Sequence, residues 1–231
     1  MTLSIIPIHG IPEISAGDDL AGMIMDNAEL EHHDILVVTQ KIISKAENRM
    51  VEVDPSDPLS HKQLVLDESV RVLRRRGELI ISETKHGFVC ANAGIDLSNV
   101  PRGTAALLPE NSDRSARRIR DAIKGRGNLD VGVIISDTFG RPWRRGITDI
   151  AIGSAGVAPI LDLRGTPDAL GREMQVTEVC LVDELSAAAE LAMGKTTNVP
   201  VAIVRGGTDD WFREGNVEDE IVRSPAEDLF R

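Results

Sequence analysis

Short, wholly apolar runs alternate along the chain with longer segments that have helical periodicity. The sharpest run is Val131 to Ile135, and similar runs occupy Asp34 to Thr39 and Val201 to Val204. Apolar runs of this length, rich in Val and Ile, are typical of buried β-strands. A further strand is expected over Met1 to Ile8, and shorter ones over Glu78 to Ser82, Phe88 to Asn92 and Met174 to Cys180.

Four segments carry apolar residues at helical spacing, which predicts helices over Leu20 to Leu30, His61 to Gly77, Ser115 to Lys124 and Val182 to Met193. Asp18 or Asp19 is expected to cap the first helix, and Asp113 the third. In the second, three consecutive arginines, Arg74 to Arg76, precede Gly77, as cations do at a helix C-terminus. The combination predicts an α+β or mixed α/β fold, with mixed sheets flanked by helices.

Length and charge restrict the function. At 231 residues the chain allows one large domain, and we expect a single unit over 1–231, with residues around 85–150 as a candidate smaller subdomain. A net charge of −11 argues against non-specific binding to nucleic acid or to an anionic membrane. No signal peptide or membrane-span pattern is found, so a soluble, cytoplasmic protein is expected. Cys90 and Cys180 lie far apart without metal-site spacing and are expected to be small buried hydrophobes.

The most informative stretch follows the run Val131 to Ile135. The run stops at Ser136, Asp137 and Thr138, and the next residues predict a loop with glycine, proline, arginines and a second acid (Gly140, Arg141, Pro142, Arg144, Arg145, Gly146 and Asp149). A carboxylate that binds a hard cation, beside arginines that face phosphate oxygens, suits a metal-bound phosphate. A local Asx turn with surface arginines explains the same pattern equally well.

Three other places hold candidate binding residues. Lys41 and Lys45 follow a strand four residues apart, so they share one helix face that either meets phosphate or is merely solvated. Asp96 and Asn99, three residues apart, either share a cation and its anion or form an Asx turn. The sequence GKTT from Gly194 resembles the end of a Walker A motif, but the upstream glycine is absent and a helix precedes it, which excludes a P-loop.

Seven stretches together resemble one family. They are GIPEISAGDDLA, DILVVTQKIISKAE, HGFVCANAGIDLSNV, LLPENSDRSARRIR, ISDTFGRPWRRGITDIAIG, GREMQVTEVCLVDELSAAAEL and PVAIVRGG. In this order they resemble coenzyme F420:L-glutamate ligases, also called F420-0:gamma-glutamyl ligases, which add γ-linked glutamates to a deazaflavin coenzyme. The resemblance covers nearly the whole chain and corresponds to the ligase unit alone, whereas some members carry a fused nitroreductase-like half.

This resemblance implies a fold that is neither Rossmann nor P-loop, a homodimer, GTP as co-substrate, two divalent cations (Mn²⁺ or Mg²⁺) and K⁺ as a further candidate. L-glutamate and coenzyme F420-0 would be the substrates. Asp96, Asp137 and Thr138 would bind metal, and Asp96 and Asp137 would be catalytic. Beyond the resemblance, Arg141, Arg144 and Arg145 are candidates to meet the coenzyme's phosphate or the glutamate carboxylates, and we take Arg141 as the third catalytic residue. GTP would contact Ile11, Pro12, Glu13, Ile14, Gln40, Lys41, Lys45, Asn99, Met193, Gly194, Lys195, Thr196, Thr197, Asn198, Val199 and Pro200.

Lys195 departs from the family pattern, because it stands where the resemblance implies a glutamine-type metal contact, and a protonated lysine cannot coordinate a metal. The implied reaction activates a carboxylate as an acyl phosphate, which the glutamate amine then attacks. Positioning and charge neutralisation carry such chemistry, so no protein nucleophile is required. Two alternatives stay open: a metal-dependent phosphohydrolase that uses the same acids, and a non-catalytic nucleotide-binding module.

Overall fold

A five-stranded sheet forms the centre of the computed structural model, which describes residues 2–57 and 59–229. Its strand order is β1-β12-β2-β8-β9, and β2 and β8 run parallel while every other neighbouring pair is antiparallel. The strands span β1 Ser4–Pro7, β2 Ile35–Thr39, β8 Gly132–Arg141, β9 Arg144–Ala155 and β12 Val201–Arg205. The predicted first strand is therefore present, although Met1 lies outside the described residues.

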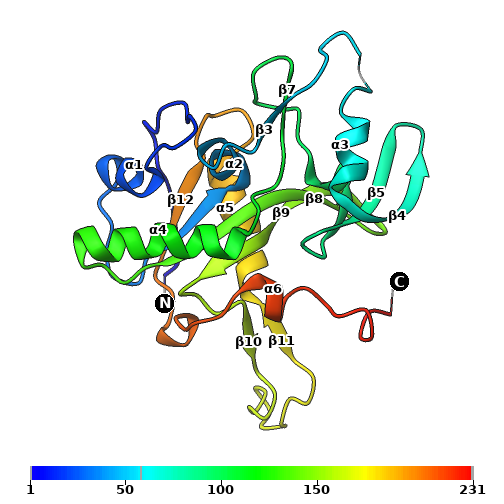
Figure 1. Ribbon diagram of the computed structural model, residues 1–231. Helices are drawn as coiled ribbons and strands as arrows, with labels where there is room; N and C mark the ends of the chain where they lie inside the picture. Colours follow the sequence, from blue (N-terminus) through cyan, green and yellow to red (C-terminus); the bar gives the residue numbers. More distant parts are fainter. Residues whose placement is uncertain (1, 58, 230–231) are drawn as a thin grey trace.

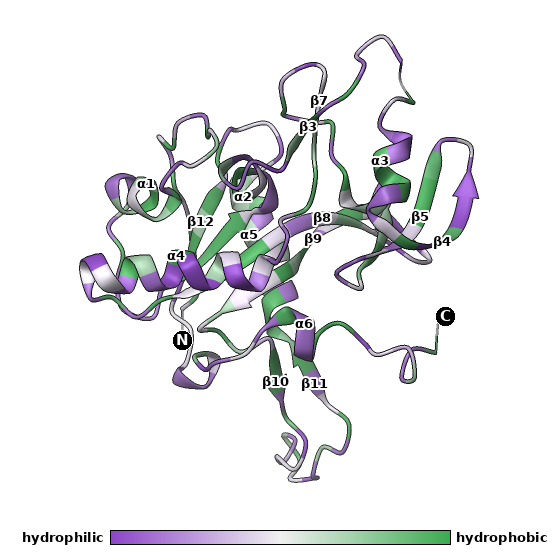
Figure 2. Cartoon of the chain, in the orientation of Figure 1, coloured by the Kyte–Doolittle hydropathy of each residue, from purple (hydrophilic) through white to green (hydrophobic). Residues whose placement is uncertain are grey.

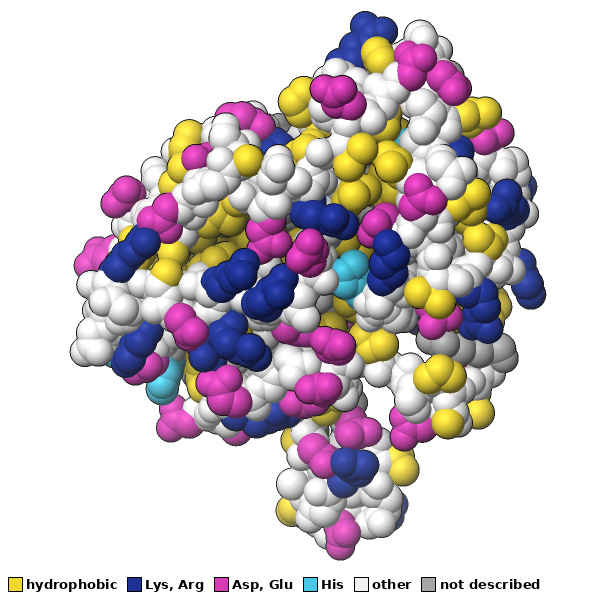
Figure 3. Space-filling view, in the orientation of Figure 1, with side chains coloured by type: hydrophobic (Ala, Val, Ile, Leu, Met, Phe, Trp, Pro, Cys, Tyr) yellow, Lys and Arg dark blue, Asp and Glu magenta, His cyan; other side chains and the backbone are white. Residues whose placement is uncertain are grey.

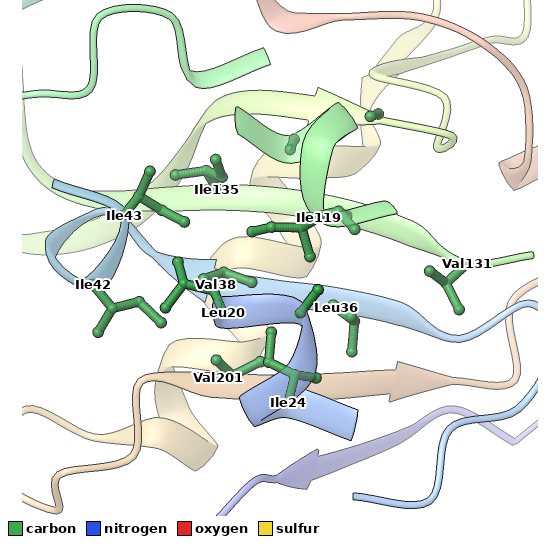
Figure 4. Packing of buried hydrophobic residues seen from close by; sticks show 14 of the residues in the cluster. Leu20, Ile24, Leu36, Val38, Ile42, Ile43, Ile119, Val131, Ile135 and Val201 are labelled. Carbon is green, nitrogen blue, oxygen red and sulfur yellow. The ribbon is translucent and has the colours of Figure 1, made fainter. Parts of the chain in front are cut away.

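Both faces of this sheet are covered by helices, as the apolar runs require. Along β2, Leu36 and Val38 point into one core, whereas Ile35 and Val37 point into another. Helices α1 (Leu20–Asn27) and α4 (Ser112–Gly127) cover the first face, and α5 (Leu181–Met193) covers the second. In Figure 4, Ile24 of α1 and Ile119 of α4 lie over the strands of the first face. Because the inner strands β2 and β12 and the first half of β8 are buried on both sides, they show no apolar–polar alternation.

A separate small core lies beside the sheet (Figure 1). Its buried residues are Val65, Ile80, Ala93, Ile95, Ala105 and Leu107. The surrounding elements are β3 (Met50–Glu52), α3 (Lys62–Asp67), β4 (Ser69–Arg76), β5 (Leu79–Thr84), β6 (Val89–Ala91), the 3-10 turn η1 (Asn92–Gly94) and β7 (Thr104–Ala106). Strands β4, β5 and β6 form one antiparallel sheet, and β3 pairs with β7.

The remaining elements lie at the periphery. Strands β10 (Ile160–Asp162) and β11 (Glu178–Cys180) begin a hairpin that projects from the body, and η2 (Asp209–Trp211) and α6 (Val217–Glu220) follow β12. Figure 2 shows hydrophobic residues along the central strands and hydrophilic ones along β4, and Figure 3 shows acidic and basic side chains interspersed over the face in view. Among the described helices, none has the length and apolar character needed to cross a bilayer. The α+β prediction with mixed sheets and flanking helices is confirmed.

The prediction of one helix over His61 to Gly77 is wrong in its second half. Helix α3 ends at Asp67, and the chain continues as strand β4, so Arg74 to Arg76 belong to a strand and not to a helix C-terminus. Leu and Arg are good helix formers, but pairing with β5 outweighs that propensity. Gly77, with φ of +55°, supplies the left-handed conformation that the two-residue turn between the strands needs.

The predicted loop around Gly140 to Gly146 is also wrong. Strand β8 continues past Thr138 to Arg141, turns at Pro142 and Trp143, and returns as β9. Asp137 and Thr138 therefore lie within a strand and not at its end. The outer half of this hairpin is exposed on both sides, so it carries no apolar alternation from which a strand could be predicted.

The caps agree with the sequence in one helix and differ in another. Asp19 caps α1, as expected, by accepting a hydrogen bond from the Gly22 N–H at 3.2 Å. The N-cap of α4 is Asn111, whose side chain accepts from the Arg114 N–H. Asp113 instead accepts hydrogen bonds from the Ser154, Val217 and Glu218 backbone N–H groups, so it joins α4 to β9 and α6.

Candidate functional site

A pocket of about 420 Å³ lies where six chain segments meet at one edge of the central sheet. Strands β1, β2 and β8 point the same way, and the pocket lies at the carboxyl ends of β1 and β2 and beside the middle of β8. Ile11 to Ile14 follow β1, Thr39 to Lys45 lie at the end of β2 and just after it, and Ser136 to Thr138 belong to β8. Asp96 and Asn99, Asp149 of β9, and the stretch from Glu190 to Pro200 complete the wall. Ligands of open α/β sheets bind preferentially at this edge, and the volume suits a small molecule.

The structure brings nearly all of the predicted binding residues into this one pocket. Its lining contains Ile11, Pro12, Glu13, Ile14, Gln40, Lys41, Lys45, Asp96, Asn99, Asp137, Thr138, Met193, Gly194, Lys195, Asn198, Val199 and Pro200. Three predicted residues do not line it. Thr196 and Thr197 belong to the same loop but lie outside the lining, and Arg141 is exposed toward the tip of the β8–β9 hairpin.

The sequence analysis missed five lining residues: Thr39, Ile42, Ser136, Asp149 and Glu190. Thr39, Ile42 and Ser136 are sequence neighbours of predicted residues. Asp149 was noticed in the central stretch, but its approach to Thr138 depends on the hairpin register, which the sequence did not indicate. Glu190 lies on α5, one turn before the loop that precedes β12, and no sequence signal distinguishes it from other helix-surface acids.

Lys41 and Asp96 form an ion pair in the pocket wall. The Lys41 Nζ lies 2.7 Å from Asp96 Oδ2 and also donates to the Ser98 carbonyl at 2.7 Å. Burial opposes ionisation of Asp96, but hydrogen bonds from Lys41 and from the Ser98 N–H outweigh it, so the pKa of Asp96 is lowered. Asp96 and Asn99 do not share a helical turn: Asp96 bridges to Ala106 in antiparallel fashion, and Asn99 has a φ of +50°.

Asp137 is the carboxylate without a cation of its own. Its pKa is raised to about 7, chiefly by burial and in smaller part by the negative charges of Asp96 and Asp149, against the opposing effects of a hydrogen bond from the Thr138 N–H and of the Lys41 charge. Among the described residues, no lysine, arginine or histidine forms an ion pair with it. A carboxyl group in such surroundings is stabilised in its charged form when a cation binds beside it.

Asp149 is almost fully enclosed, with 3% of its surface exposed. Its Oδ1 accepts hydrogen bonds from the Thr138 hydroxyl at 2.7 Å and from the Lys195 Nζ at 2.6 Å, and Ser136 Oγ lies 3.4 Å from its Oδ2. Lys195 Nζ also lies 2.7 Å from Thr138 Oγ1 and 3.4 Å from Glu190 Oε1. These contacts join β8, β9, α5 and the following loop into one charged wall.

On the side of the pocket formed by helix α2 (Gln40–Ala46), the polar side chains are already paired with other groups of the protein. Lys45 forms an ion pair with Glu13. Gln40 is only 2% exposed, and its amide nitrogen donates to Ser44 Oγ and to the Leu107 carbonyl at 2.9 Å. These bonds fix the start of α2 (Gln40–Ala46) against β7, so Gln40 positions the helix whose lysines line the pocket.

Neither cysteine has the lowered thiol pKa that is typical of a nucleophile. The pKa of the Cys90 thiol is raised to about 12, chiefly by burial and in smaller part by the nearby Asp137 charge. The pKa of Cys180 is likewise raised to about 12 by burial. Cys90 is buried as expected, whereas Cys180 is only half-buried.

The residues present fit a divalent cation that is held partly by a substrate. Within the described residues, no three His, Cys, Asp or Glu side chains converge as a complete metal cage. Mg²⁺ commonly takes one or two carboxylates and completes its shell with phosphate oxygens and water. Asp137, with Asp96 beside it, supplies this kind of incomplete donor set at the pocket wall.

Comparison with known proteins identifies the family. The profile of the F420-0:Gamma-glutamyl ligase family matches residues 10–206. A coenzyme F420:L-glutamate ligase of Methanopyrus kandleri is 40% identical over an alignment that covers all of this chain and 98% of that protein. The enzyme of the same name from Methanothermobacter thermautotrophicus is 39% identical, with full coverage of both chains. The chain belongs to the F420-0:gamma-glutamyl ligase family.

A third relative, the coenzyme F420:L-glutamate ligase of Methanococcus maripaludis, is 39% identical over 96% of this chain and 94% of that protein. The resemblance deduced from the seven sequence stretches is therefore confirmed. The range that matches the F420-0:gamma-glutamyl ligase family contains every residue of the pocket lining, from Ile11 to Pro200. The pocket is thus the candidate active site of a member of this family.

Proposed function

We propose that this protein is a GTP-dependent ligase that joins L-glutamate, through its amine, to a carboxylate of coenzyme F420-0, and that it extends the product by γ-linked glutamates. The full-length relatives bear the name of this activity, and the chain covers them almost completely. The observation that carries the proposal is the pocket, because it gathers lysines, carboxylates and apolar side chains from six segments around the carboxyl ends of β1 and β2.

The pocket lining suits a nucleoside triphosphate. Apolar side chains such as Ile11, Ile14 and Val199 offer a surface for a base, while Lys41 and Lys45 at the start of α2 offer positive charge to phosphates. Lysine binds phosphate as a mobile point charge, so the ion pairs that Lys41 and Lys45 now make with Asp96 and Glu13 can exchange for phosphate oxygens.

The proposed reaction has two steps. A carboxylate oxygen of coenzyme F420-0 attacks the γ-phosphorus of GTP, the bond to the β–γ bridging oxygen breaks, and GDP leaves. The glutamate amine then attacks the acyl carbon, inorganic phosphate leaves with the former carboxylate oxygen, and the amine loses a proton. Lys41, Lys45 and Lys195 offset the phosphate charge in both steps.

A divalent cation, Mn²⁺ or Mg²⁺, would be held by Asp137, with Asp96 and Thr138 beside it. When bound, it would supply positive charge to the phosphate oxygens. Arg141, on the exposed hairpin, is proposed to meet the coenzyme's phosphate or a glutamate carboxylate, since a guanidinium group pairs with either anion. We further propose a homodimer and K⁺ as an additional cation, both on the strength of family membership.

An isotope experiment tests the mechanism directly. Coenzyme F420-0 is labelled with ¹⁸O in its carboxylate and incubated with GTP, Mn²⁺ and L-glutamate. The acyl phosphate route transfers one ¹⁸O to the phosphate released when the first glutamate is added, and one GDP forms for each glutamate. Phosphate released in later additions is unlabelled, because the carboxylate then activated belongs to the glutamate already joined. Unlabelled phosphate released without glutamate addition would instead favour a phosphohydrolase, and binding of GTP without any turnover would favour a nucleotide-binding module.

A further inference from the structure

The Lys195 ammonium is built into the acidic wall of the pocket. It lies 2.6 Å from Asp149 Oδ1 and 2.7 Å from Thr138 Oγ1, with Glu190 Oε1 at 3.4 Å. Three separate elements therefore supply its oxygen neighbours: β8, β9 and α5. An arrangement of oxygens around one positive centre is what a metal ion would have, but here the positive charge belongs to the chain.

The backbone before the lysine fixes its position. Gly194 has a φ of +64° and its N–H donates to the Glu190 carbonyl at 2.7 Å, so α5 ends sharply and the loop turns toward the pocket. The Thr197 hydroxyl donates to the Met193 carbonyl, which closes the loop. The side chain thus reaches Asp149 from a defined starting point.

The charges of the wall indicate how many further cations it accepts. Asp96 has Lys41, Asp149 has Lys195, and Asp137 has no cationic partner among the described residues. A divalent cation bonded to Asp149 Oδ1 would lie about 2.1 Å from that oxygen. It would therefore occupy the space that the Lys195 ammonium fills. The Asp149 end of the wall is therefore filled, and the Asp137 end is open.

We infer that Lys195 takes the place of one of the two divalent cations expected for this family, so that each chain uses a single divalent cation at Asp137 and a covalently attached cation at Asp149. The inference rests on the proposed nucleotide- and metal-dependent function. The ammonium would face the nucleotide phosphates from a fixed position and needs no binding step of its own.

Counting Mn²⁺ bound to the protein tests the inference without reference to turnover. Equilibrium dialysis or electron paramagnetic resonance measures Mn²⁺ per chain in the presence of a saturating non-hydrolysable GTP analogue. The variants are Lys195→Gln, whose amide oxygen can bind a metal, Lys195→Arg, which keeps the cation, and Lys124→Gln as control. Lys124 is a fair match because its side chain is as exposed as that of Lys195, 44%, and it also pairs with an aspartate, Asp130.

The expected count is one Mn²⁺ per chain for the wild type, Lys195→Arg and Lys124→Gln, and two for Lys195→Gln. Two Mn²⁺ ions in the wild type would overturn the inference while leaving the proposed function intact. One Mn²⁺ in a folded Lys195→Gln variant would also overturn it, since the lysine would then not occupy a metal position. No bound Mn²⁺ in any variant would overturn both the inference and the proposed metal site.

Discussion

Thr138 and Asp149 stand directly opposite each other in the antiparallel pairing of β8 with β9, and the threonine hydroxyl donates to the carboxylate at 2.7 Å. The two residues are eleven positions apart in sequence. Their contact exists because β8 runs past the sheet and folds back as a hairpin. The acidic wall of the pocket thus depends on this hairpin as much as on the buried strands.

Replacing Asp137 tests the proposed metal site. Asp137→Asn keeps the shape of the side chain but removes its charge, so cation binding should weaken and the glutamylation rate should fall by about 100-fold or more. The rate is measured by product mass and GDP release at saturating Mn²⁺. Asp130→Asn, on the surface, serves as control and should retain a normal rate. Normal rates in Asp137→Asn would refute the metal assignment.

Asp34 provides a test of fold stability away from the pocket. It is fully buried before β2, where its Oδ2 accepts from the Glu31 N–H at 2.7 Å and from Arg205 Nη2 at 2.8 Å. Both carboxylate oxygens of Asp34 accept hydrogen bonds from N–H donors. In Asp34→Asn an NH₂ group replaces one of these oxygens, in whichever orientation the amide takes, and it cannot accept those bonds. We expect a loss of about 1–3 kcal/mol in the free energy of unfolding, measured by urea titration.

The control for this substitution is Asp162→Asn, which breaks an exposed contact with Arg164 on the projecting hairpin. Its urea midpoint should match that of the wild type, because exposed ion pairs contribute little. If Asp34→Asn were equally harmless, the network of Asp34 with Arg205 would not stabilise the start of β2.

Two glycines make a matched pair. A Cβ on Gly153 would lie 2.3 Å from the Ser112 carbonyl carbon, so Gly153→Ala forces β9 and α4 apart. A loss of about 1–3 kcal/mol is expected from this overpacking. Gly125, inside α4, has open space around it, and Gly125→Ala should stabilise the protein by about 0.5–1 kcal/mol. Thermal unfolding of both variants checks the opposite signs, and equal shifts would contradict the packing described.

The raised pKa of Asp183 should make the free energy of unfolding depend on pH. Burial raises its pKa, although the carboxylate accepts a hydrogen bond from the Ala151 N–H at 2.9 Å. Because the folded state holds this proton more tightly than the unfolded state, the contribution of Asp183 to stability is full below its ordinary pKa of 3.8. It is lost as the pH rises from there through the raised value.

The side chain of Asp183→Asn cannot ionise. The free energy of unfolding of this variant, relative to that of the wild type, should therefore increase as the pH rises from 3.8 to neutrality. Urea titrations at several pH values measure this difference. A difference that stays constant with pH would show that the Asp183 pKa is equal in the two states.

The elements that are buried on both faces could be predicted from the sequence. The run Asp34 to Thr39 became β2, which spans Ile35–Thr39, and the segment Val182 to Met193 became α5 with one residue more. Such elements satisfy their hydrophobic pattern locally, so their period identifies them. Lys41 and Lys45, which follow β2, were singled out from the pattern for this reason, whereas most other pocket residues were expected only from the resemblance to the family.

Features that depend on pairing between distant segments could not be predicted from the sequence. Strand β4 contains helix-forming residues and is a strand only because β5 lies beside it. The contact between Lys195 and Asp149 joins residues 46 positions apart, and only the folded hairpin and loop create it. Local propensity carries no information about either of these partners.

The central claim is the ligase activity, and the measurement that tests it most directly is mass spectrometry of coenzyme F420-0 after incubation with the protein, GTP, Mn²⁺ and L-glutamate. The account predicts products heavier by one or more glutamyl units, with one GDP formed for each unit added. Coenzyme that keeps its original mass at every Mn²⁺ and Mg²⁺ concentration, in a preparation that binds GTP and is folded, would contradict it.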